Sequence, residues 1–333
     1  MTLTVWGIVL ISSLFVLVKT ADFFTDYAEK LGKIFKLPNF IIGVMIVAVG
    51  TSLPELVTSI MGVQSGEAEF LSGNVLGTVI VNILLGLGIA VLLTKKKTKF
   101  DWDIVSNDFP FFAAAIFLII VTLYDGLFTW PEAILFLAGY VVYVFYAYFM
   151  QREEKKAIKE KLAKQINKEI KSDMSDVKIA GEKELTTTRI VIYLLISLGI
   201  VAGASHFVVE SVISIAAILG LGTSVIAASA VALGTSLPEI LVATSAARRG
   251  NFDMAIGDIL GSNIFDIFVI YGVAGLMTTL TITPELYAIM MMFLVGSFIM
   301  MWLIFIDKKI TKTEALLFIL IYIFFIGKLF KIF

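Results

Sequence analysis

The chain has 333 residues, of which 59% are hydrophobic and 16% are charged, and its net charge is −1. Soluble domains are nearer half apolar and a quarter charged, so the composition excludes an ordinary soluble protein and gives no sign of nucleic-acid binding. The chain has no cysteine, which excludes disulfides, thiol catalysis and thiolate metal sites. Oxygen atoms are therefore the expected ligands of any bound ion.

Long apolar segments predict an all-α integral membrane protein with ten transmembrane helices. Phe70–Thr94 and Leu286–Ile306 contain no charged residue and are each long enough to cross the hydrocarbon core. The first segment begins at Leu3 without a basic region, so we expect it to be retained as a span. The ten predicted segments are 3–28, 39–63, 69–93, 105–124, 130–150, 188–217, 222–246, 254–279, 283–306 and 313–331.

The basic residues predict the orientation of these spans. Of the 26 Lys and Arg residues, 23 lie in the first, third, fifth, seventh and ninth loops, and none lies in the even-numbered loops. Basic loops remain in the cytoplasm. We therefore expect a multi-pass protein of the cell membrane with both termini outside. Residues 151–187 form the long polar linker between the two groups of five spans and are expected to lie in the cytoplasm.

A duplicated motif relates the two halves. Residues 50–55 and 234–239 both read GTSLPE, and the spacing of 184 residues also places Gly73, Gly77 and Asn82 on Gly257, Gly261 and Asp266. Because an odd number of spans separates the copies, they have opposite orientations in the membrane. This pattern predicts two inverted-topology repeats, residues 1–150 and 188–333, with an ion site at the membrane midplane.

The chemistry of the motif favours cations. Pro54 has no N–H to donate to the carbonyl of Gly50, so carbonyls near Ala48–Thr51 are candidate ligands. Ser52 and Thr51 lie three and four residues before Glu55 and so share a helix face with it. The next span adds Thr78 and Asn82. The second copy contributes the corresponding residues Thr235, Ser236, Glu239, Ser262 and Asp266. These oxygen donors suit Ca²⁺ or Na⁺.

Glu55, Glu239 and Asp266 are three carboxylates within spans that contain no Lys or Arg. A charged carboxylate at the bilayer centre costs at least about 2.5 kcal/mol, so cations or protons are expected to balance them. If Ca²⁺ and Na⁺ occupy overlapping positions, and only the neutralised site changes its facing direction, the ions must be exchanged. The rivals are a passive channel and an intramembrane hydrolase, although the hydrolase lacks a recognisable nucleophile–base pair.

These residues and motifs resemble the calcium/cation antiporter superfamily, specifically the prokaryotic sodium/calcium exchangers. The resemblance covers nearly the whole chain and includes the GTSLPE copies and the segment GSNIFD at 261–266. It implies alternating access, an alpha-1 motif at 41–83 and an alpha-2 motif at 225–267. It implies a transporter without a cofactor, not an enzyme, that acts as a monomer in the lipid bilayer and carries Ca²⁺ and Na⁺.

The resemblance also implies a role for each site residue. Glu55 and Glu239 would be the main ligands of Ca²⁺, with the carbonyls of Thr51 and Thr235, and Asn82 and Asp266 would complete the centre. Flanking Na⁺ positions would be built from the hydroxyls and carbonyls of Ser52, Ser236, Ser262, Thr78, Ala48 and Ala232.

Two residues depart from the family pattern. Thr78 stands where serine is usual, and Asp258 stands where asparagine is usual, as at Asn74 in the first repeat. We favour a helix-start role for Asp258 over a change in the charge of the site. Coupling to H⁺, or to K⁺ together with Na⁺, stays open at the level of the sequence.

Overall fold

The computed structural model describes residues 2–35, 37–64, 68–96, 98–100, 104–147, 149, 186–218 and 233–332. These residues are almost wholly helical, apart from an antiparallel pair of short strands, β1 (Leu127–Phe128) and β2 (Leu280–Thr281). Helices satisfy backbone hydrogen bonds within one segment, as a hydrocarbon environment requires. Seven helices among the described residues are long and apolar enough to cross a membrane. The prediction of an all-α membrane protein is confirmed.

In the first half, two long helices change locally to the wider π-helical form. The helices of this half are α1 (Leu3–Ile34), α2 (Asn39–Ile42) continuing through η1 (Gly43–Val47) into α3 (Ala48–Gln64), α4 (Ala68–Val81) continuing through η2 (Asn82–Gly86) into α5 (Leu87–Leu93), α6 (Ile104–Asn107), α7 (Phe109–Thr122) and the helix Trp130–Ala147.

The second half contains another such interrupted helix. Its helices are α9 (Thr187–Ile218), α11 (Leu237–Arg249), α12 (Phe252–Phe265) continuing through η3 (Asp266–Ile270) into α13 (Tyr271–Met277), α14 (Pro284–Phe305) and α15 (Lys312–Leu329). Of the predicted elements, most of the linker (151–185) and the start of the seventh span (222–232) lie outside the described residues.

The helix boundaries repeat at the spacing of the sequence motif. Helices α1 and α9 begin at residues 3 and 187, so their first residues are 184 positions apart. The same spacing relates η2, which begins at Asn82, to η3, which begins at Asp266. Single π-helical turns occur often at functional sites. Two motif residues therefore mark equivalent irregular turns in the two halves.

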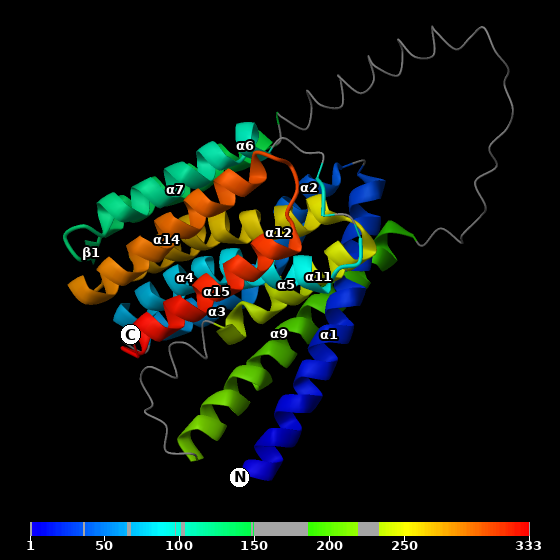
Figure 1. Cartoon of the computed structure of the whole chain (residues 1–333), viewed down its shortest axis with the longest axis horizontal. Coiled ribbons are helices and arrows are strands. Elements are labelled where there is room, and N and C mark those ends of the chain that lie inside the picture. The colour runs from blue at the N-terminus through cyan, green and yellow to red at the C-terminus, as the bar shows by residue number, and fades with distance from the viewer. Residues whose placement is uncertain are drawn as a thin grey trace, which may run out of the picture.

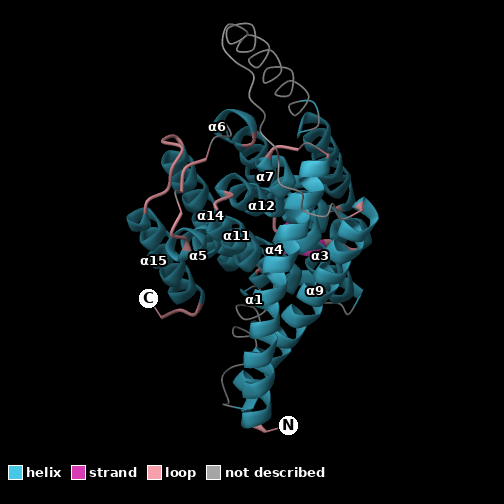
Figure 2. Ribbon diagram, turned by 90° about the vertical axis from the view of Figure 1, so that its right-hand side faces the viewer, coloured by secondary structure: helices cyan, strands magenta, loops and turns pink. Residues whose placement is uncertain are grey.

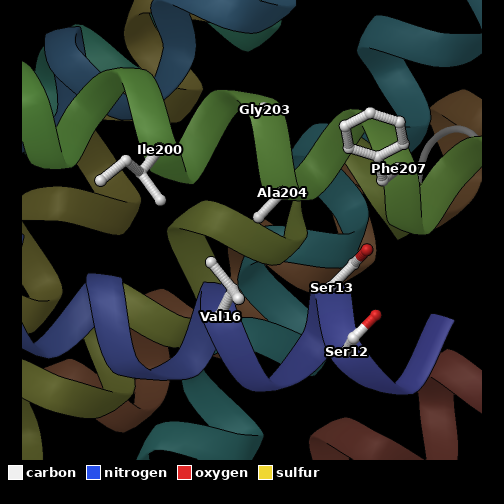
Figure 3. Close-up of a pocket in the computed structure, with 7 residues that line it drawn as sticks. All are labelled: Ser12, Ser13, Val16, Ile200, Gly203, Ala204 and Phe207. Carbon is white, nitrogen blue, oxygen red and sulfur yellow. The ribbon is translucent and has the colours of Figure 1, made fainter. Parts of the chain in front are cut away.

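Helices α1 and α9 lie side by side and run in opposite directions (Figures 1 and 2). The rings of Tyr27, near the end of α1, and Tyr193, near the start of α9, have centroids 5.1 Å apart. Further along the pair, a pocket of about 320 Å³ lies between Ser12, Ser13 and Val16 of α1 and Ile200, Gly203, Ala204 and Phe207 of α9 (Figure 3). No acidic residue lines this pocket, so it is separate from the charged groups of the motifs.

Polar contacts also join α1 to α11. Ser245 donates a hydrogen bond to Asp22 over 2.5 Å, and the guanidinium of Arg249 donates to Asp26 over 3.0 Å. Arg249 also donates to the backbone carbonyl of Asp22. Asp22 therefore has a packing role that connects two helices. These contacts hold the basic end of α11 against α1.

Glycines allow α12 to approach the second span closely. A Cβ atom at Gly257 would lie 2.3 Å from the carbonyl oxygen of Phe40, and one at Gly261 would lie 2.8 Å from the Cα of Val44. A Cβ at Gly43 would in turn meet the carbonyl oxygen of Met254. Close contact of this kind through small residues is a main source of helix association in membranes. It brings the polar face of α12 next to the motif of α3.

Candidate cation-binding site

The first GTSLPE copy lies in α3, and its polar side chains are buried. Thr51 and Ser52 have no exposed surface, and Glu55 is 3% exposed. Although Pro54 cannot donate to the carbonyl of Gly50, α3 continues through Pro54 as one helix. The hydroxyl of Thr51 donates to the carbonyls of Val47 and Ala48, each over 3.2 Å, so the Ala48 carbonyl already accepts a hydrogen bond.

The second copy has a different backbone. A turn at Ser236 precedes α11, which begins at Leu237 with Pro238 in its first turn. Pro238 cannot donate to the carbonyl of Gly234, and the hydroxyl of Ser205 in α9 donates to that carbonyl over 2.8 Å. The carbonyl freed by proline is thus bound by a neighbouring helix. Ser205 corresponds to Ala21 in the first half, where this bond has no equivalent.

We expect Ser205→Ala to destabilise the protein by about 1–3 kcal/mol, because the buried carbonyl of Gly234 loses its donor. Ser197→Ala is the matched control, since Ser197 is also buried in α9 but donates within its own helix, to Leu194. Thermal unfolding of the purified variants in detergent provides the measurement. Equal melting temperatures for the two variants would show that the Ser205 bond contributes nothing specific.

The two copies meet through side chains. Ser52 of the first copy donates a hydrogen bond to Oε1 of Glu239 in the second, over 3.4 Å. In the reverse direction, Glu55 lies near the hydroxyl of Thr235 and experiences the charges of Glu239 and Asp266. Glu239 is fully buried and Asp266 is 1% exposed. Residues 184 positions apart therefore share one buried acidic centre.

The neighbouring spans complete this centre with amides and hydroxyls. Asn82, the first residue of η2, donates through its amide to Oδ1 of Asn263 over 3.2 Å. Thr78 and Ser262 are also buried, at 2% and 0% exposure. Asn263 was not among the predicted site residues, because its counterpart at the repeat spacing is Val79. The sequence feature that could have identified Asn263 is its position within the segment 261–266.

Several oxygen atoms in the centre receive no hydrogen bond from the described part of the chain. They are Oε2 of Glu239, both carboxylate oxygens of Asp266, Oδ1 of Asn82 and the hydroxyl of Ser262. Buried polar atoms normally have partners, and no Lys or Arg is among the buried residues described. A bound cation would satisfy these atoms and balance the charge.

The ligand set is mixed, because no group of three Asp, Glu or His side chains among the described residues is close enough to hold an ion by itself. Hydroxyls and amides must therefore complete any coordination, as hard cations allow. The described structure brings together residues from α3, η2, α11, α12 and η3. Ala232 lies outside the described residues.

Comparison with known proteins agrees with this geometry. The family described as "Sodium/calcium exchanger protein" matches residues 5–149 and 189–331, which together form most of the chain. The chain belongs to the sodium/calcium exchanger family. It is consequently a membrane transporter and not an enzyme, and the family supports antiport of cations including Ca²⁺. The resemblance seen in the sequence is confirmed.

Individual relatives match over most of the chain. The sodium/calcium exchanger MaX1 of Methanosarcina acetivorans is 32% identical, over 99% of this chain and all of that protein. The inner membrane protein YrbG of Escherichia coli is 29% identical, over 84% of this chain and 82% of that protein. A structure of the sodium-calcium exchanger NCX_Mj, soaked with Na⁺ and Sr²⁺, has a TM-score of 0.78 and 25% identity, and covers 98% of this chain and 99% of its own.

Proposed function

We propose that this exchanger moves Ca²⁺ across the membrane in exchange for Na⁺ by alternating access. The main observation is the hydrogen bond of Ser52 to Glu239, which joins the two GTSLPE copies beside Glu55. Two carboxylates with surrounding hydroxyls can hold one Ca²⁺ or, alternatively, several Na⁺ ions. Because the positions overlap, occupation by one ion excludes the other, and the transport of the two is coupled.

The proposed architecture is a pair of inverted-topology repeats with ten spans. Residues 1–150 and 188–333 form the repeats, and residues 151–187 form the linker. The family match in two separate segments supports this division. The antiparallel contact of α1 and α9 supports it as well, since equivalent helices of inverted repeats run in opposite directions. The protein is proposed to act as a monomer.

We assign the roles in the site by chemistry. Glu55 and Glu239 would carry the charge that binds Ca²⁺, because their side chains lie beside the contact between the two copies. Asn82 and Asp266 would complete the centre from the π-helical turns. The carbonyls of Thr51 and Thr235 would add to the Ca²⁺ ligands. The flanking Na⁺ positions are assigned to the hydroxyls and backbone carbonyls of Ser52, Ser236, Thr78, Ser262, Ala48 and Ala232.

The proposed orientation places both termini outside and the linker in the cytoplasm. It rests on the concentration of basic residues in the odd-numbered loops. The chain has no cysteine, so a single introduced cysteine would be the one thiol that a labelling reagent can modify. A cysteine at Lys309 should react with an impermeant reagent only from the cytoplasmic side, and a cysteine at Thr278 only from outside. The opposite pattern would reverse the assigned orientation.

Coupling is tested by calcium uptake into proteoliposomes under imposed gradients of Na⁺, H⁺ or K⁺. We expect an outward Na⁺ gradient to drive uptake, with no uptake when only H⁺ or K⁺ gradients are present. Uptake driven by H⁺ alone would indicate a proton/calcium exchanger, and a requirement for K⁺ with Na⁺ would indicate potassium co-transport. Calcium flux without any counter-ion would indicate a passive channel.

A further inference from the structure

Asp258 is a further buried acidic residue near the centre, and none of the assigned roles uses it. It has no exposed surface, and neither of its carboxylate oxygens receives a hydrogen bond from the described residues. It lies six residues after Phe252, the first residue of α12, and therefore not in the first turn of the helix. The helix-start role favoured by the sequence does not fit this position, since helix-end effects fade beyond the first turn.

The side chain of Asp258 belongs to the same face as the proposed ligands of α12. Asp258, Ser262 and Asp266 follow one another at intervals of four residues, which places them in a row along one side of the helix. Asp258 also experiences the charge of Glu239 and lies near the hydroxyl of Thr51. In the described structure that hydroxyl donates to the carbonyls of Val47 and Ala48.

The two halves differ at this position. The first-half row reads Asn74, Thr78 and Asn82, whereas the second-half row reads Asp258, Ser262 and Asp266. Asp258 thus places a carboxylate where the repeat spacing places a neutral amide. Along α12, Asp258 is nearer than Asp266 to the turn that connects α11 to α12. Arg248 and Arg249 end α11 at this turn, which is the proposed cytoplasmic side.

We propose that Asp258 is an additional anionic ligand of a monovalent cation of the sodium class, in a position next to Thr51 and Ser262. A single carboxylate with hydroxyl oxygens suits a singly charged hard cation, whereas Ca²⁺ is served by the pair of glutamates. The flank of the centre nearer α12 then binds Na⁺ more tightly than the flank nearer Asn74. This inference deepens the proposed exchange function and rests on it.

The test compares Asp258→Asn with wild type in purified, detergent-solubilised protein. Binding of ²²Na⁺ is measured over a range of Na⁺ concentrations, and binding of ⁴⁵Ca²⁺ is measured without Na⁺. We expect the apparent Na⁺ affinity of the tightest site to fall by about tenfold or more, since loss of a group that only supports a metal ligand already costs that much elsewhere. The Ca²⁺ affinity should change by less than about threefold, because Glu55 and Glu239 are retained.

The reciprocal variant Asn74→Asp is the matched comparison, since it adds the same charge at the equivalent place and should tighten Na⁺ binding. Asp258→Ser provides a second variant if the asparagine variant does not fold. An unchanged affinity and number of bound Na⁺ ions in the folded Asp258 variants would overturn the proposal. Failure of wild type to exchange Na⁺ for Ca²⁺ would instead refute the proposed function. The Na⁺-binding comparison would still decide whether Asp258 is a ligand, because it measures binding and not transport.

Discussion

Glu55→Gln and Glu239→Gln should each abolish sodium-driven calcium uptake, reducing it by about a hundredfold or more. Glutamine keeps the size of the side chain but removes its charge, and Ca²⁺ sites depend on the number of charged ligands. Both residues are buried, and each lies beside a hydroxyl of the opposite GTSLPE copy. The loss of either charge therefore leaves a single glutamate carboxylate at the contact between the two copies. Uptake of ⁴⁵Ca²⁺ into Na⁺-loaded proteoliposomes provides the measurement.

Glu285→Gln is the control for these two variants, because Glu285 is an exposed carboxylate whose nearest cation is Lys331 at 3.5 Å. We expect it to transport at the wild-type rate, since exposed ion pairs contribute little. Melting temperatures would show that the glutamine variants are folded. If one glutamate variant retained most of its uptake while the other lost it, the carboxylates would not form one shared site.

Gly257→Ala should destabilise the fold by about 1–3 kcal/mol or more. The added methyl carbon would lie 2.3 Å from the backbone oxygen of Phe40 and 3.3 Å from the Cα of Gly43. Because these are backbone atoms, the helices themselves must separate. The displacement moves the acidic face of α12 away from α3, so transport should be lost as well.

Gly296→Ala tests whether this effect is specific. Gly296 is also within a membrane helix, but a Cβ there would meet no atom within 4 Å. This variant should melt at or slightly above the wild-type temperature, since alanine favours helix more than glycine does. Fluorescence-detected thermal melting of both proteins in detergent distinguishes them. A Gly257 variant as stable and active as the Gly296 variant would show that α12 and the second span tolerate a wider separation.

Much of the architecture was predictable because membrane helices obey local rules. Apolar length located the spans, and the 184-residue spacing anticipated the matching first residues of α1 and α9. The same spacing paired Asn82 with Asp266, which begin the two π-helical turns. The turns themselves were not predicted, because they depend on backbone packing that leaves no residue pattern of its own.

Contacts between helices were less accessible to sequence reasoning. Spacing shows which residues share a helix face, but not which face of another helix lies opposite. The bond from Ser205 to the carbonyl of Gly234 and the bond between Asn82 and Asn263 therefore emerged only from the fold. The continuity of α3 through Pro54 has the same origin, because surrounding helices can support a backbone that proline weakens.

The central claim is that Ca²⁺ and Na⁺ compete for one centre formed by both halves of the chain. Equilibrium binding of ⁴⁵Ca²⁺ to the purified protein, with increasing Na⁺, tests it most directly. We predict that one Ca²⁺ binds per chain and that Na⁺ displaces it completely with a dependence steeper than one-to-one, since several Na⁺ ions replace it. Simultaneous binding of Ca²⁺ and Na⁺ without mutual displacement would contradict the shared centre.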